Sequence, residues 1–176
     1  GTLLFEIGDP NLKRELNDGI VLSLRHSAGR LRGEVNYYYY HIKDFVFLAP
    51  TGEFDEESGF EIANYSQATS RFQGTEAKLD VGIYRNVWLN FATDYVNAKL
   101  TASNTPIPRI PPWRGRFGID ADYKGFHIKP EVIMARDQDQ IFPTETRTPR
   151  YTTFGLMASY SVAQKHAVHI FSLNPF

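Results

Sequence analysis

Apolar and charged side chains alternate strictly along the segment from Trp113 to Lys124. Successive side chains of a β-strand point to opposite faces, so this segment predicts a strand with one apolar and one ionic face. Such a strand is suited to a boundary between lipid and water. The apolar face holds Trp113, Gly115, Phe117, Ile119, Ala121 and Tyr123, and the other face holds Arg114, Arg116, Gly118, Asp120, Asp122 and Lys124.

The same alternation continues through most of the chain. The third strand, for example, sets Leu79 against Lys78 and Asp80. Helical spacing fits no useful window, and Gly, Thr, Tyr and Val are frequent in the runs. We therefore predict an all-β protein. The expected strands are residues 19–27, 31–47, 61–84, 87–101, 112–124, 126–137, 150–162 and 166–174.

Short and long connections between the predicted strands alternate. In an up-and-down meander, all short turns then lie at one end of the sheet and all long loops at the other. This asymmetry is typical of outer-membrane barrels, and several predicted strands reach the ~9–11 residues that a tilted membrane strand needs. The short turns are expected at 27–30, 85–86, 124–125 and 163–165, and the long loops at 48–60, 102–111 and 138–149.

One residue conflicts with this pattern. Pro130 lies in the middle of a predicted strand, on its apolar face. Proline has no amide hydrogen and removes a ladder hydrogen bond, so we expect either a bulge or an edge position there.

Composition narrows the possible partners and chemistry. The chain has 176 residues, with 19 Lys and Arg against 20 Asp and Glu, so it lacks the basic surplus of a nucleic-acid-binding protein. Cysteine is absent, which excludes disulfides and thiolate metal sites. No apolar run approaches the ~18 residues that a membrane-spanning helix requires.

Four motifs occur in a recognisable order along the chain. Together they resemble segments of TonB-dependent outer-membrane receptors, in which a G-(N/D)-P-x-L-x-x-E segment precedes a barrel strand of the C-terminal half. The motifs are Gly8–Glu15 (GDPNLKRE), Ala63-Asn64-Tyr65 with Gly74-Thr75-Glu76, Ile107–Pro112 (IPRIPP) and Val168–Phe176 (VHIFSLNPF).

The resemblance implies an antiparallel up-and-down transmembrane β-barrel segment in the outer membrane of a Gram-negative bacterium. Residues 1–176 would be a single C-terminal portion of a barrel of about 22 strands, without the plug domain and the final strand. By the same resemblance, the intact protein would contact membrane lipid, its plug and the TonB complex. It would take up a scarce solute, such as a ferric siderophore, cobalamin or a glycan, and would perform no chemical step.

Three alternatives remain open at this point. A soluble, lipocalin-like barrel that binds a small ligand shows the same alternation with the apolar face inside. An outer-membrane barrel enzyme is a further class. If the chain is a fragment, its eight strands could also close on themselves, although an eight-stranded interior holds only side chains.

Sequence motifs for catalysis, nucleotide binding or zinc binding are absent, and we expect neither a cofactor nor a metal site. His166 and His169 are three residues apart, so a strand would place them on opposite faces. The ionic face offers the best binding candidates. Arg114 and Arg116 lie nearest the long-loop end of their strand and could steer an anionic ligand.

Overall fold

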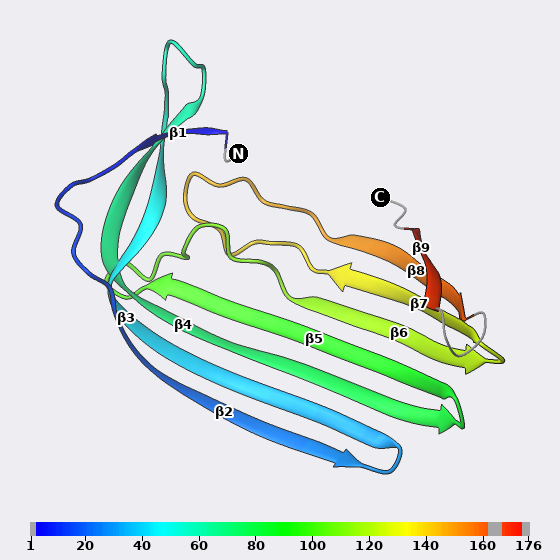
Figure 1. The fold of residues 1–176 in the computed structure, drawn as a ribbon. Helices are drawn as coiled ribbons and strands as arrows, with labels where there is room; N and C mark the ends of the chain where they lie inside the picture. Colours follow the sequence, from blue (N-terminus) through cyan, green and yellow to red (C-terminus); the bar gives the residue numbers. More distant parts are fainter. Residues whose placement is uncertain (1–2, 162–166, 174–176) are drawn as a thin grey trace.

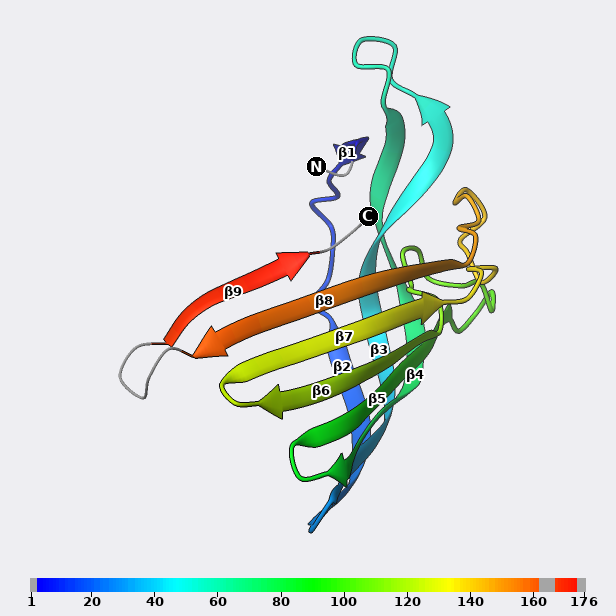
Figure 2. The same cartoon turned by 90° about the vertical axis from the view of Figure 1, so that its right-hand side faces the viewer.

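The structure is a computed structural model that describes residues 3–161 and 167–173. In these ranges the chain forms one β-sheet without helices, which confirms the predicted fold class. Figures 1 and 2 show a curved and twisted sheet with β2 at one margin and β9 at the other. The strands are β1 (Leu4–Ile7), β2 (Leu16–Ala28), β3 (Leu31–Phe54), β4 (Glu61–Tyr84), β5 (Val87–Leu100), β6 (Arg114–Tyr123), β7 (Phe126–Ala135), β8 (Tyr151–Ser161) and β9 (Ala167–Leu173).

Strands β2 to β9 follow one another in space in chain order, and every neighbouring pair is antiparallel. Strands β2 and β9 are the two ends of this path, so the sheet of the described residues is open, and the alternative in which the eight strands close on themselves is not found. An eight-stranded barrel has room inside only for side chains, whereas here whole loops pack against one face of the sheet.

The two ends of the sheet differ as the connections predict. Tight turns at 29–30, 85–86 and 124–125 define one end, which we call the turn end. The connections 55–60, 101–113 and 136–150 define the other, which we call the loop end. The turn predicted at 163–165 lies outside the described residues.

At the loop end, one predicted strand boundary is wrong and one strand was not predicted. Strand β3 continues to Phe54, so most of the loop predicted at 48–60 is a long hairpin arm of β3 and β4. The unpredicted strand β1 pairs with the start of β4 in parallel, from Leu4 opposite Glu61 to Ile7 opposite Asn64. Four residues are too few to show a clear alternation, and a parallel partner cannot be inferred from a local pattern.

A one-residue bulge interrupts β3 near its middle. Ile42 lies opposite Ser70, but Phe45 lies opposite Ala68, so β3 contains one residue more than β4 over this interval. Asp44 has a φ of 53°, a left-handed conformation that Asp tolerates better than most residues. The bulge reverses which face each later residue of β3 occupies.

The reversal places Phe45 and Phe47 on the ionic face, where they join an apolar cluster. Ala98, Leu100 and Ile107 form its buried centre. The amide of Ile107 donates to the carbonyl oxygen of Ala98 at 3.0 Å, so the loop after β5 folds back over the sheet. The remaining members of this loop-end cluster are Ala68, Phe72, Val96, Ile110 and Phe142.

The loops 101–113 and 136–150 are also bonded to each other. The Arg109 amide donates to Glu145 Oε1 at 2.7 Å, and Gln138 Nε2 donates to the carbonyl oxygen of Ile110. The ring of Phe142 lies 6.0 Å from that of Phe47, centroid to centroid. The two loops therefore form one cover over the loop end of the ionic face.

The motif Gly8–Glu15 crosses from β1 to β2 and is held at the bulge. Gln67 Oε1 accepts from the Lys13 amide at 2.6 Å, and Gln67 Nε2 donates to the carbonyl oxygens of Lys13 at 2.6 Å and Asp44 at 2.7 Å. Glu15 Oε1 accepts from the Val46 amide at 2.6 Å. These side chains satisfy backbone groups beyond Leu16 and Lys43, where the β2–β3 ladder ends.

Pro130 occupies neither a bulge nor an edge, so that expectation is wrong. Strand β7 lies between β6 and β8. The β6–β7 register pairs Gly118 with Glu131 and Ala121 with Ile128, and it omits the two pairs between them. The register is the same on both sides of the gap, so the strand continues in line past a proline that cannot donate to the ladder.

Candidate functional site

The register extends the alternation of single strands into two continuous faces. One row across the sheet runs from Leu79 to Phe91, Phe117, Val132 and Phe154. Leu79 is 40% exposed and Phe154 is 64% exposed, so this apolar face does not form a dry core within the chain. A closed soluble barrel would bury these side chains, and the described residues do not form one.

The opposite face carries ion pairs between neighbouring strands. Arg25 on β2 lies 3.1 Å from Glu34 on β3, and Glu34 also accepts from Asn36 Nδ2 at 2.8 Å. Asn90 Nδ2 donates to Asp80 Oδ1 at 2.7 Å between β5 and β4. Opposite charges in facing positions stabilise strand pairing, so the ionic face is a set of cross-strand contacts.

The two arginines predicted as binding residues lie on this face, and both are paired. Arg114 contacts Asp94 through Nη2 at 2.9 Å and Nε at 3.0 Å. Arg116 lies 3.9 Å from Glu131, and its side chain is 50% exposed. Arg114 is thus closely paired with Asp94, whereas the contact between Arg116 and Glu131 is longer and looser. The role of the two arginines in ligand steering stays a prediction.

A recess of about 460 Å³ lies beside these arginines. It presents hydroxyl, carboxylate and guanidinium groups and is open to solvent. Its polar lining includes Tyr38, Glu76, Asp94, Arg114 and Arg116, and Pro111 borders it from the loop after β5.

The position of Tyr38 also explains why the second motif has a glycine at position 74. Its ring lies over Gly74, where an added Cβ would collide with the phenol and with the carbonyl oxygen of Tyr95. Tyr40 stacks on Tyr38 at 5.5 Å between ring centroids and covers Gly19 in the same way. The two glycines therefore leave space for the rings of Tyr38 and Tyr40 against the sheet.

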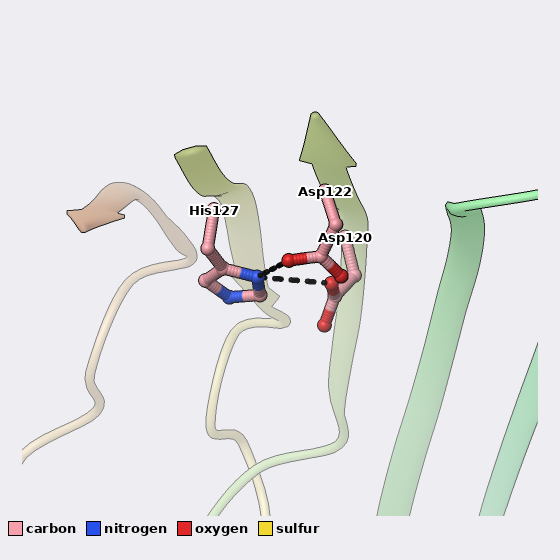
Figure 3. A group of neighbouring side chains, drawn as sticks. All are labelled: Asp120, Asp122 and His127. Atoms are coloured by element: carbon pink, nitrogen blue, oxygen red, sulfur yellow. Dashed lines mark hydrogen bonds and ion pairs between the residues drawn. The ribbon is translucent and has the colours of Figure 1, made fainter. Parts of the chain in front are cut away.

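Asp120, Asp122 and His127 form a polar group at the turn end, which the sequence analysis did not predict. Asp120 and Asp122 are two residues apart on β6, so they share a face, and the tight turn at 124–125 places His127 opposite Asp122. His127 Nδ1 lies 3.0 Å from Asp122 Oδ1 and 3.6 Å from Asp120 Oδ1. Figure 3 shows the imidazole ring directed at both carboxylates.

The three donor atoms lie within 4.8 Å of one another, which is compatible with binding one metal ion. The sequence contains a signal for this group, because two aspartates and a histidine lie on either side of the Lys124-Gly125 turn. Recognising that the three side chains meet requires the register of the hairpin, which pairs Asp122 with His127. The predicted absence of a metal shared by His166 and His169 stays a prediction, because His166 and the side chain of His169 lie outside what the structure describes.

A long-stranded antiparallel sheet with one apolar and one ionic face, tight turns at one end and long loops at the other, is the wall of an outer-membrane type of β-barrel. The sequence matches the family of TonB dependent receptor-like β-barrels over residues 1–174. The chain belongs to this family, as the resemblance of its motifs indicated. Among the residues described, no helix is both long and apolar enough to cross a membrane.

Solved structures of this family share the fold. The copper transporter OprC aligns with a TM-score of 0.80 over 88% of this chain, at 16% identity. A variant of the ferric enterobactin receptor PfeA from Pseudomonas aeruginosa aligns at 0.66 over 87%, at 15% identity. The siderophore receptor PirA from the same species aligns at 0.64 over 92%, at 13% identity.

The chain covers 24%, 24% and 26% of those three proteins, respectively, so it spans about a quarter of their length. Its open sheet accordingly corresponds to part of a larger barrel.

Proposed function

We propose that this chain forms part of the barrel wall of an outer-membrane receptor for TonB-dependent uptake of a scarce solute. The apolar face contacts lipid, and the ionic face lines the lumen, where it meets water and the plug domain of the intact protein. The observation that supports this most directly is the two-faced sheet, with a continuous row of exposed or half-buried apolar residues on one side and cross-strand ion pairs on the other. The chain contributes to binding and transport, with no chemical step.

The solute class that we favour is a metal chelate or metal ion. The structural neighbours are named as a copper transporter, a ferric enterobactin receptor and a siderophore receptor, whereas cobalamin and glycans are transported classes that the sequence leaves open. Many ferric chelates are anionic, and the lining of the recess includes a loosely paired cation, Arg116. Arg114 and Arg116 would steer such a solute inward.

The lipid assignment is tested by placing one charge on each face of the same strand. Leu24 is 75% exposed on the apolar face, and the adjacent Ser23 lies on the ionic face opposite Asn36. In the intact receptor, Leu24→Arg should cost about 2–4 kcal/mol in lipid, whereas Ser23→Arg should cost little. The measurement is the yield of detergent-extracted, heat-modifiable receptor in outer-membrane fractions. Equal yields would contradict the assignment.

Uptake is tested separately. Cells that produce the intact receptor should accumulate a labelled ferric siderophore, cobalamin or oligosaccharide only when the TonB complex is functional. The doubly substituted receptor Arg114→Ala, Arg116→Ala should take up an anionic chelate more slowly at low ionic strength, because steering by charge is screened by salt. Unchanged uptake at low salt would remove the two arginines from the proposal, and uptake independent of TonB would contradict the function itself.

A further inference from the structure

We infer that Asp120, Asp122 and His127 bind a divalent transition-metal ion at the turn end of the ionic face. This carboxylate–imidazole group lies on two strands joined by a two-residue turn, at the opposite end of β6 from Arg114. Two oxygen donors and one imidazole nitrogen, drawn together in Figure 3, form a mixed donor set.

Two of the three distances between the donor atoms fit a common metal ligand sphere, and all three donors lie within 4.8 Å of one another. Ligands about 2.1 Å from one ion are about 3.0 Å apart at a right angle and about 3.4 Å apart at the tetrahedral angle. The separations of 3.0 and 3.6 Å from His127 Nδ1 to the two carboxylate oxygens lie close to these values. The longer one exceeds a hydrogen-bond distance and is an ion-pair contact, so the same ring nitrogen lies close to both carboxylates.

The local charge also favours a cation. In the described part of the chain, His127 is the only basic group with an ion-pair contact to Asp120 or Asp122. Lys124, beside the turn, has its Nζ 5.2 Å from the ring centroid of Tyr123. Arg32, on the ionic face, is stacked over Trp88 at 4.5 Å. Lys129, which the register places opposite Asp120, makes no ion-pair contact with either carboxylate, so two carboxylates share one paired basic group among the described residues.

The backbone holds the donors in place before any ion binds. Asp122 and His127 are direct partners in the β6–β7 ladder, and the Asp122 amide donates to the carbonyl oxygen of Asn86 at 2.9 Å in the neighbouring turn. Side chains fixed on paired strands lose little further freedom on binding. The imidazole selects borderline ions such as Cu²⁺, Zn²⁺ or Ni²⁺ over Mg²⁺ and Ca²⁺, which prefer oxygen ligands alone.

Copper(II) is the sharpest probe, because it binds such donors most tightly and its paramagnetic resonance spectrum reports a coordinated imidazole nitrogen. The intact receptor, purified in detergent and stripped with a chelator, is titrated with Cu²⁺. The difference between wild type and His127→Gln should be about one equivalent of copper coupled to one nitrogen. His26→Gln is the matched control, because it removes an exposed histidine elsewhere in the sheet and should leave this signal unchanged.

Asp122→Asn provides a second variant, since it keeps the shape of the side chain and removes its charge. It should weaken copper binding at this site at least about tenfold, and Zn²⁺ should displace the copper signal. Identical copper spectra and affinity in wild type and His127→Gln would overturn the site and leave the three residues as an ion-pair group. The measurement needs no transport, so failure of the uptake experiment would not affect it.

Discussion

The ionic face has two parts that are built in opposite ways, although β5 runs through both. Toward the turn end, the side chains of the ionic face are charged and exposed to solvent. The Arg25 side chain on β2, for example, remains 73% exposed in its ion pair. At the loop end, Ala98 and Ile107 are both only 3% exposed, and the loops seal them. Asp94 and Ala98 are only four positions apart on β5. The same face is therefore charged where water reaches it and apolar where loops cover it.

The strongest test of this contrast lies in the loop-end cluster. Ile107→Ala removes a buried side chain and should cost about 2–5 kcal/mol of loop docking. Hydrogen exchange at the Leu100 and Ile107 amides, which bond Thr105 and Ala98, should accelerate by more than about tenfold. Ile83→Ala, at a 54% exposed position on the apolar face, is the control. Unchanged exchange would mean that the loops are not held by burial.

The boundary between the two parts is tested at Gln67. Gln67→Ala removes three hydrogen bonds that hold Lys13 and Asp44, and it should cost about 1–3 kcal/mol locally, since water replaces part of each bond. Exchange at the Lys13 amide should rise several-fold. Gln73→Ala, on the same strand, should leave this amide unaffected, and an equal effect of both variants would contradict the assigned role.

In the charged part of the ionic face, the ion pairs should contribute little one at a time. A double-mutant cycle on Arg114→Ala and Asp94→Ala should give a coupling energy of about 0–1 kcal/mol, because both side chains are partly exposed. The coupling should shrink as salt is added. It is measured from exchange of amides in the β5–β6 ladder. A coupling as large as the effect of Ile107→Ala would break the contrast between the two parts.

The smallest effect is expected outside both parts, at the tip of the β3–β4 hairpin. The Ser58 hydroxyl and amide donate to Asp55 Oδ2 at 2.6 and 2.8 Å and hold the pKa of Asp55 below its ordinary value of 3.8. The ionised carboxylate thus stabilises the turn above pH 3.8, and this stabilisation is lost as pH falls through the folded pKa.

Protection of the Ser58 amide should therefore decline only in acid, at pH values below about 4. The measurement is the ratio of observed to intrinsic exchange rates between pH 3 and 7. The decline should vanish in Asp55→Asn and persist in Glu56→Gln. Protection that is constant across this range in the unsubstituted protein would show that the hydrogen bonds to Ser58 do not depend on ionisation.

Alternation predicted the part of the sheet toward the turn end well, because a regular strand keeps its facing from residue to residue. Leu79, Phe117 and Ile119 lie on one face and Arg114, Arg116 and Asp120 on the other, as the sequence indicates. The loop end could not be predicted in this way. An uninterrupted alternation from Tyr37 and Tyr39 would place Phe45 and Phe47 on the apolar face, and nothing local reveals the extra residue at the bulge.

The candidate sites show the same limit. Arg114 and Arg116 could be chosen from one strand because their shared face follows from spacing alone. That Asp94 neutralises Arg114 depends on the register between β5 and β6, which the long loop 101–113 does not fix in the sequence. The carboxylate–imidazole group depends likewise on the pairing of Asp122 with His127 across a turn.

The extra residue in β3 has a consequence for exchanging outer hairpins between receptors of this family. Suppose that a hairpin is joined to another receptor on the loop-end side of Asp44. Its side chains then keep their faces only if the recipient strand also contains the extra residue of the bulge, because a difference of one residue moves every side chain to the opposite face. Deleting Asp44 alone would move Phe45 and Phe47 to the apolar face. The loops would then lose the two phenylalanines against which they pack. A chimera should therefore be cut on the turn-end side of the bulge, so that donor hairpin and bulge travel together.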